Sequence, residues 1–293
     1  MAKKAKKIQT ILALKNRYDS LRKGKESLLT LLEDVELAES VYNSNAIENS
    51  TLTLPDTEKI LLDLEVSKDY SLREVFEAKN LARVYEYIRT KKASLILNHE
   101  TILFLHGLLI GGIDDSIAGR FRAAGEYVRV GRHVAPAPEH VARMVEVLLD
   151  EYISEPDANI LEKIAQFHLQ FETIHPFCDG NGRIGRVLIN MQLQVFGYPN
   201  IIIRDKEKHL YYKTFTQFRQ TKSTKQMERI LYLALAEGLH KRIAYLEGQE
   251  VITLSEYARG TQESLAGLIN AGRRQTIPAF REKGVWKIGI VRK

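Results

Sequence analysis

The chain has 293 residues, of which 44% are hydrophobic and 27% are charged, and this ordinary globular composition excludes a disordered chain and a fibre. The single cysteine, Cys178, excludes an internal disulfide and zinc or redox sites of the CxxC type, and no apolar run approaches the roughly 20 residues of a membrane span. The net charge of +6 arises mostly near the C-terminus, because residues 239–293 hold ten Lys or Arg against five Glu.

The N-terminal residues Met1–Lys7 are basic, but they lack the apolar stretch and the small-residue cleavage site of a signal peptide. We interpret them as a frayed tail and expect a cytoplasmic protein. The chain is long enough for one large domain with an appendage or for two small domains.

Apolar residues recur at helical spacing in several segments, which predicts a mostly helical core. The predicted helices run from Glu26 to about Asn45 and over Leu72–Lys91, His99–Leu109, Pro138–Ile153 and Leu161–Ile174. Gly111, Gly112, Pro136 and Pro156 lie between them, as residues that interrupt helices commonly do.

A short segment in the middle of the chain has the alternation of a strand instead. The side chains of Glu126–Val130 are expected to alternate outward and inward, a turn follows at Gly131, and Val134 resumes the pattern before a proline. This order predicts a β-hairpin.

The C-terminal residues predict a separate small module with a boundary near residue 246. A helix near Leu254–Arg259, a second near Ser264–Ala271 and a strand around Val285–Ile288 resemble a helix-turn-helix with a wing. Its positive charge favours an acidic partner such as nucleic acid, while a solvated basic surface or a dimer contact remains the alternative.

The segment from His175 to Arg186 carries the strongest chemical signal. Pro176 disfavours helical geometry in the residue before it, so one helix ends at Ile174 and another begins after the loop. Glycines at 180 and 182 allow successive backbone amides to face one concavity, to which the new helix adds its positive dipole end. The sequence therefore predicts an anion hole suited to phosphate.

Charged side chains of the same segment fit a bound polyphosphate. Arg183 and Arg186 are three residues apart, so both project from the first turn of one helix. Asp179 offers the oxygen ligand that Mg²⁺ prefers, and the imidazole of His175 can accept a proton near neutral pH. Each residue alone also fits a structural role, but their combination on one loop favours a functional site.

This segment resembles the signature HPFx(D/E)GNGRxxR of the Fic family at every fixed position. The resemblance extends over most of residues 40–235 and includes the stretch Gly119–Arg122. It implies a mainly α protein, with a helical Fic core, a short β-hairpin flap and the small C-terminal module. Fic proteins mostly transfer AMP from ATP to a hydroxyl side chain of a target protein.

The resemblance also implies roles for single residues. His175 would be the base that deprotonates the target Ser, Thr or Tyr, and Asp179 would hold Mg²⁺ on the α- and β-phosphates. Arg186 would hold the γ-phosphate, and Phe177 would be a core anchor. The anion hole would be lined by Gly180, Asn181, Gly182 and Arg183. Cys178 falls at the variable position, and we interpret it as a buried filler.

Two further parts of the nucleotide site follow from the resemblance. The flap would comprise Val130, Gly131, Arg132 and His133, lie over the nucleotide and pair with the target backbone. Tyr211 and Tyr212 would lie near the adenine, with ordinary core packing as the alternative. Many relatives carry an Asn for the base, where this chain offers Gln217, Arg219 and Gln220.

A second motif, Ser44–Asn49, resembles the inhibitory pattern (S/T)xxxE(G/N) of one class of Fic proteins. Ser44 and Glu48 are one helical turn apart, and a carboxylate at the negative end of a helix favours a nearby cation. The family points to Arg186 as that cation, which would withdraw it from the γ-phosphate.

The sequence thus predicts an autoinhibited protein adenylyltransferase that uses ATP and Mg²⁺. The predicted regions are an N-terminal helical region at 1–95, the Fic core at 96–245 and the module at 246–293. One alternative is a nucleotide-sensing regulator that binds DNA, and another is a Fic enzyme that removes AMP or transfers a different phosphate-linked group. The DNA contacts would come from Arg259, Arg273, Arg274 and Lys287. A homodimer stays open.

Overall fold

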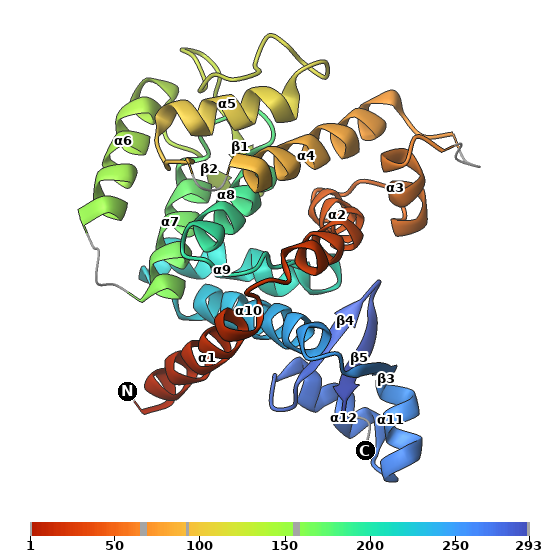
Figure 1. Ribbon diagram of the computed structural model, residues 1–293. Coiled ribbons are helices and arrows are strands. Elements are labelled where there is room, and N and C mark those ends of the chain that lie inside the picture. The colour runs from red at the N-terminus through yellow and green to blue at the C-terminus, as the bar shows by residue number, and fades with distance from the viewer. Residues whose placement is uncertain (1, 65–68, 92–93, 155–158, 292–293) are drawn as a thin grey trace. The chain divides into compact units, whose positions relative to one another are not determined.

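The computed structural model describes residues 2–64, 69–91, 94–154 and 159–291 (Figure 1). Contacts between residues divide the chain into two compact units. The larger unit comprises Leu37–Gly197 and Ile202–Glu228, and the smaller unit comprises Met1–Glu36, Tyr198–Ile201 and Arg229–Lys293. The three regions predicted from the sequence remain a prediction. Pro156, predicted to separate two helices, lies outside the described residues.

The larger unit is helical and is built around one central helix, α8 (Asn181–Val195). Nearly every side chain of α8 is buried, and the helices that contact it include α4, α5 and α7. The other helices are the end of α2 (Glu26–Ile47), α3 (Leu54–Leu61), α4 (Leu72–Lys91), α5 (His99–Ile110), α6 (Pro138–Ser154), α7 (Ile160–Ile174) and α9 (Lys208–Thr221), preceded by a short 3-10 turn at Asp205–Glu207. One hydrophobic cluster joins most of them.

A two-stranded hairpin interrupts the helices of the larger unit. Strand β1 (Arg129–Val130) pairs antiparallel with β2 (His133–Val134), with Val130 opposite His133. We call residues 129–134 the flap. The strands are shorter than the sequence predicts. The last bond between them, on the side away from the turn, runs from the amide of Ala135 to the carbonyl of Val128.

The smaller unit contains α1 (Ala2–Leu21), most of α10 (Lys225–Leu246) and the C-terminal module. The module comprises β3 (Glu250–Thr253), α11 (Leu254–Thr261), α12 (Leu265–Arg273), β4 (Ala279–Glu282) and β5 (Val285–Ile290). Its antiparallel sheet has the order β3-β5-β4, and both helices pack on it through their own apolar cluster.

A buried network of charges also stabilises the smaller unit. Glu36 pairs with both Lys241 and Arg242, at 3.0 Å and 2.6 Å. Lys241 reaches Glu282 as well, at 3.2 Å, and Glu282 accepts a further bond from the hydroxyl of Tyr245. Arg242 is only 1% exposed, so its charge depends on this pairing.

The structure confirms the five helices predicted before Pro176 to within a few residues. The prediction of a frayed N-terminal tail is wrong, because Ala2–Leu21 forms α1. Lys, Ala and Leu are strong helix formers, and a positive charge at the start of a helix does not prevent a helix that packs on other elements. No helix among the residues that the structure describes is both long and apolar enough to cross a membrane.

Candidate functional site

The loop between α7 and α8 holds His175 in an uncommon backbone conformation. His175 ends α7 with φ of +50°, and its amide donates to the carbonyl of Phe171 at 2.8 Å. Its own carbonyl accepts a bond from Nε of Arg122 at 2.9 Å, and Arg122 also donates to the carbonyls of Glu126 and Pro136. A buried arginine therefore joins the candidate base to the residues on either side of the flap.

The start of α8 provides the amides expected of an anion hole. Gly180 lies just before the helix with φ of +80°, and the first intrahelical bond runs from Ile184 to its carbonyl at 2.9 Å. The amides of residues 181–183 precede that bond and so have no acceptor within the helix. The side chain of Asn181 does not face this site, because it bonds both backbone groups of Phe177, at 2.9 Å and 2.8 Å. Asn181 thus shapes the loop.

His106 of α5 contacts the loop between α7 and α8 through a hydrogen bond and through ring stacking. Gly119 donates its amide to Nδ1 of His106 at 3.0 Å, so the proton of the ring lies on Nε2 and is donated to the carbonyl of Asp179, also at 3.0 Å. The ring stacks on Phe177 with 3.7 Å between centroids, which agrees with the predicted anchor role of Phe177. Burial lowers the pKa of His106 to about 4, so the imidazole stays neutral at physiological pH.

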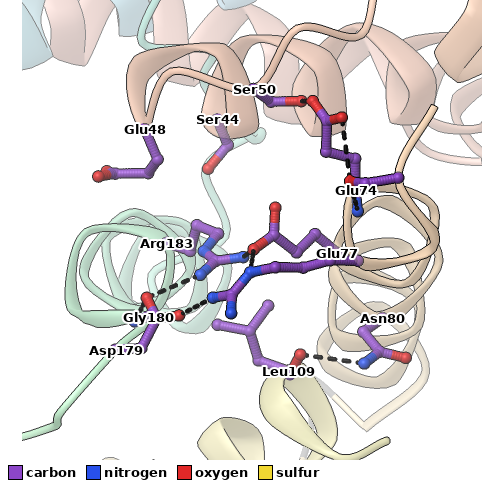
Figure 2. Close-up of polar contacts among 12 residues, drawn as sticks. Ser44, Glu48, Ser50, Glu74, Glu77, Asn80, Leu109, Asp179, Gly180 and Arg183 are labelled. Carbon is purple, nitrogen blue, oxygen red and sulfur yellow. Dashed lines mark hydrogen bonds and ion pairs between the residues drawn. The ribbon is translucent and has the colours of Figure 1, made fainter. Parts of the chain in front are cut away.

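Asp179 is surrounded by cations. Its carboxylate pairs with Arg183 at 3.0 Å (Figure 2). It also pairs with Arg73 of α4. Burial acts to raise the pKa of Asp179, but Arg183, the amide of Gly180 and Arg73 more than offset it, and the pKa lies below its usual value. The carboxylate is therefore an anion that remains 35% exposed.

Arg183 is held between two acids, as Figure 2 shows. Besides Asp179, it pairs with Glu77 of α4 at 3.1 Å, and its side chain is only 4% exposed. Glu77 also pairs with Arg73 at 3.1 Å. The sequence analysis missed Arg73 and Glu77, although their spacing of four residues places them on one face of a helix that it did predict.

Arg186 is bound by the predicted inhibitory motif. Its Nε donates to the hydroxyl of Ser44 at 2.9 Å, and its Nη2 donates to the Ser44 carbonyl and to Glu48, each at 2.8 Å. The guanidinium is buried, whereas the Glu48 side chain is 37% exposed. Burial would lower the pKa of Arg186, but Glu48 outweighs it and the pKa is raised, so Arg186 remains charged.

Helix α4 also contacts the chain just after the inhibitory motif. Glu74 accepts a bond from the hydroxyl of Ser50 (Figure 2). It also accepts bonds from the amide and the hydroxyl of Thr51. Residues 73, 74 and 77 of one helix thus bind both the loop between α7 and α8 and the chain that follows the predicted inhibitory motif.

The two predicted adenine contacts lie in different environments. Tyr211 is 1% exposed, and its hydroxyl bonds Nε2 of His168 at 2.7 Å. Its ring therefore offers no open face in this structure. Tyr212 is 39% exposed and donates to the carbonyl of Ile47 at 2.7 Å.

The flap residues are mostly open to solvent. Val130 is 44% exposed, and Gly131 and Arg132 are exposed as well. His133 lies against the site, because its Nε2 bonds the carbonyl of Thr173 at 2.9 Å, two residues before the candidate base.

Cys178 does not have the properties of a nucleophile. Burial, followed by the neighbouring Glu126, raises the pKa of its thiol to about 11, so the thiolate is scarce at neutral pH. The side chain is half-buried, which agrees only partly with a buried filler. Within the described ranges, no group of three or more His, Cys, Asp or Glu is arranged to hold a metal without other ligands.

Comparisons with known proteins support the family resemblance of the segment that contains the loop between α7 and α8. Residues 96–193 match the model of the Fic/DOC family. They are a Fic domain. The protein adenylyltransferase Fic of Nematostella vectensis is 34% identical over 182 residues, which cover 60% of this chain and 42% of that protein. The chain therefore spans less than half of the length of this relative.

Solved Fic structures share the fold. A Fic domain containing signaling protein from Bacteroides thetaiotaomicron is 27% identical with a TM-score of 0.74, covering 82% of this chain and 98% of that chain. A solved part of Fic-1 from C. elegans is 25% identical with a TM-score of 0.70, covering 84% of this chain and 72% of that one. The predicted helical fold with a short hairpin is confirmed.

Proposed function

We propose that the protein transfers AMP from ATP to the hydroxyl of a Ser, Thr or Tyr side chain, on a target protein and on itself. The observation that carries the proposal is the loop between α7 and α8, with His175 at one end and, at the other, the first amides of α8, which have no acceptor within the helix. The name of the Nematostella relative, a protein adenylyltransferase, supports it.

The reaction requires a base near the α-phosphorus. The hydroxyl oxygen of the target forms a bond to that phosphorus, the bond from phosphorus to the bridging oxygen breaks, and pyrophosphate leaves. The proton of the hydroxyl passes to a ring nitrogen of His175. A positioned base accelerates such a step by about 10²–10⁴-fold.

The positive groups of α8 would hold the phosphates. The amides of residues 181–183 and the guanidinium of Arg183 would bind the α- and β-phosphates, and Arg186 would bind the γ-phosphate once it is free of Glu48. Charge fixed in this way is most effective where water is excluded, and both arginines are buried.

Asp179 fits the predicted magnesium ion. Its carboxylate is anionic and partly exposed, and Mg²⁺ prefers one or two carboxylates together with phosphate oxygens. When bound, the ion neutralises charge that develops on the phosphate oxygens. Binding at Asp179 requires that its contact with Arg73 opens.

Glu48 would make the enzyme autoinhibited, since it occupies the guanidinium intended for the γ-phosphate. A hundredfold suppression needs a bias of only about 2.7 kcal/mol. One partly buried ion pair together with the two bonds to Ser44 is sufficient for a bias of this size.

The test uses ATP labelled separately at the α- and γ-phosphorus. Glu48→Gly should raise incorporation of the α label into protein by about a hundredfold, and the double variant Glu48→Gly/His175→Ala should incorporate none. Retention of the γ label would contradict AMP transfer. Loss of AMP from a previously labelled protein on addition of the wild type would assign the reverse reaction instead.

We also propose nucleic acid as a partner of the C-terminal module, as a second candidate function. The order β3, α11, α12, β4, β5 is that of a helix-turn-helix with a wing, and Arg259, Arg273 and Arg274 are exposed. Lys287 is a weaker candidate because it pairs with Glu282 at 2.7 Å.

Fluorescence anisotropy of the full chain with duplex DNA tests this partner. Affinity should fall steeply between about 50 and about 200 mM salt, and the double variant Arg273→Ala/Arg274→Ala should weaken binding. A chain that binds no DNA at the lower salt concentration contradicts the proposal.

A further inference from the structure

Glu172 is a buried acid beside the candidate base, and the family signature does not include it. It lies on the last turn of α7, three residues before His175, and is 9% exposed. Its Oε2 lies 3.7 Å from Nδ1 of His175. In the described part of the chain, neither Nδ1 of His175 nor Oε1 of Glu172 has a hydrogen-bond partner.

The surroundings keep this carboxylate charged. Burial acts to raise the pKa of Glu172, but the imidazoles of His175 and His168 and the guanidinium of Arg186 outweigh it, so the pKa lies below its usual value. Gly185 of α8 leaves the necessary room, since a Cβ there would lie 2.7 Å from Oε1 of Glu172.

Arg219 also interacts electrostatically with Glu172, whereas two other basic groups near it have partners of their own. Arg186 pairs with Glu48, and Nε2 of His168 bonds the hydroxyl of Tyr211. The imidazole of His175 lies within ion-pair distance of Glu172, with 3.7 Å between Nδ1 and Oε2. The carboxylate is therefore directed at the base more than at the phosphate-binding arginine.

We propose that Glu172 is the positioning residue of His175. This inference rests on the proposed function, because it requires His175 to act as the base. An anionic carboxylate next to Nδ1 favours the tautomer with its proton on Nδ1, which leaves the lone pair of Nε2 for the target hydroxyl.

The same contact stabilises the imidazolium that forms when the hydroxyl proton arrives. The separation of 3.7 Å is longer than a hydrogen bond. Contacts between a base and its orienting group are often long without substrate and shorten in the reacting complex. Glu172 therefore acts in the transition state more than in nucleotide binding.

The experiment uses the full chain with Glu48→Gly, so that activity is measurable. Adding Glu172→Gln should lower kcat for incorporation of labelled AMP by about 10²-fold, while KM for ATP and the calorimetric affinity for ADP change less than about twofold. Glu172→Asp keeps the charge at a longer distance and should lose only about tenfold. Glu162→Gln, on the same helix, is the matched control and should leave kcat unchanged.

The outcomes separate this inference from the proposed function. If the Glu48→Gly protein incorporates no label that depends on His175, the proposed function fails. If it does incorporate label, a full kcat with Glu172→Gln overturns the positioning role, and so does an equal loss of ADP affinity. Should Glu172→Gln not fold, an unchanged kcat with Glu172→Asp overturns it.

Discussion

Two buried networks of charged side chains, one in each compact unit, differ in how completely their members are paired. In the smaller unit, Glu36, Arg242 and Glu282 have no buried side-chain atom without a hydrogen-bond partner, within the described part of the chain. In the larger unit, the network at the candidate site leaves several such atoms. They are Nδ1 of His168, Oε1 of Glu172, Nδ1 of His175, Nε of Arg183 and Nη1 of Arg186.

This difference fits a structural role for the first network and a ligand-binding role for the second. A buried polar group without a partner costs about 1–3 kcal/mol, so a native protein keeps few of them. Their concentration around α8 indicates a site whose remaining donors are completed by a ligand. The paired network has nothing left to offer a ligand and contributes to folding alone.

The largest expected effect comes from breaking the paired network. Glu36→Ala leaves Arg242 as a buried charge without its acid, and the free energy of unfolding should fall by about 3–5 kcal/mol. Urea titration measures it. Glu247→Ala is the control, because its partner Arg17 is 55% exposed and such pairs contribute less than about 1 kcal/mol. Equal losses in both variants would contradict the contrast.

The second prediction concerns the dependence of stability on pH, because the network at the candidate site contains histidines. Burial lowers the pKa of His168 to about 4, against about 6.5 for an unfolded His. Between these values the unfolded state binds a proton that the folded state does not, so stability falls as pH drops from about 6.5 to about 4, by up to about 3 kcal/mol. Calorimetric Tm values over this range should fall less steeply for His168→Gln, and an unchanged slope would contradict the assignment.

A smaller effect tests the acid that holds Arg183. Glu77→Gln removes the charge opposite that guanidinium, and we expect affinity for ADP to fall about tenfold, or about 1.4 kcal/mol, because Arg183 loses its fixed direction. Isothermal calorimetry measures the affinity. Glu86→Gln, an exposed position of the same helix, is the matched control. Tighter ADP binding by Glu77→Gln would assign Glu77 to inhibition instead.

The smallest effect concerns the neutral half of the inhibitory contact. Ser44→Ala removes the acceptor of Nε of Arg186 but leaves Glu48 in place, so inhibition should weaken by about 1 kcal/mol. Incorporation of labelled AMP should then rise about fivefold, well below the effect of Glu48→Gly. A rise as large as that of Glu48→Gly would show that the hydroxyl, not the carboxylate, dominates the contact.

The sequence predicted those parts of the site that lie within one loop or one helix. Pro176 and two glycines define the bend, and the spacing of Arg183 and Arg186 defines a common helix face. The contact between Glu48 and Arg186 was expected from the family resemblance, because no periodicity links residues that are 138 positions apart.

Residues missed by the sequence analysis act across long separations. Arg73 and Asp179 are 106 positions apart. The sequence of α4 indicates that Arg73 and Glu77 share a helix face, but it does not indicate which residues that face contacts. The two adjacent tyrosines illustrate the same limit, since the hydroxyl of Tyr211 bonds a buried histidine while that of Tyr212 donates to the carbonyl of Ile47 at the end of α2.

The left-handed backbone of His175 has a consequence for the evolution of this loop. At the position that ends a helix with positive φ, chains usually carry glycine or asparagine, because other side chains crowd their own backbone. A substitution by glycine would relieve that crowding while it removes the imidazole. With His175 as the proposed base, selection for stability and selection for chemistry act in opposite directions at this single residue.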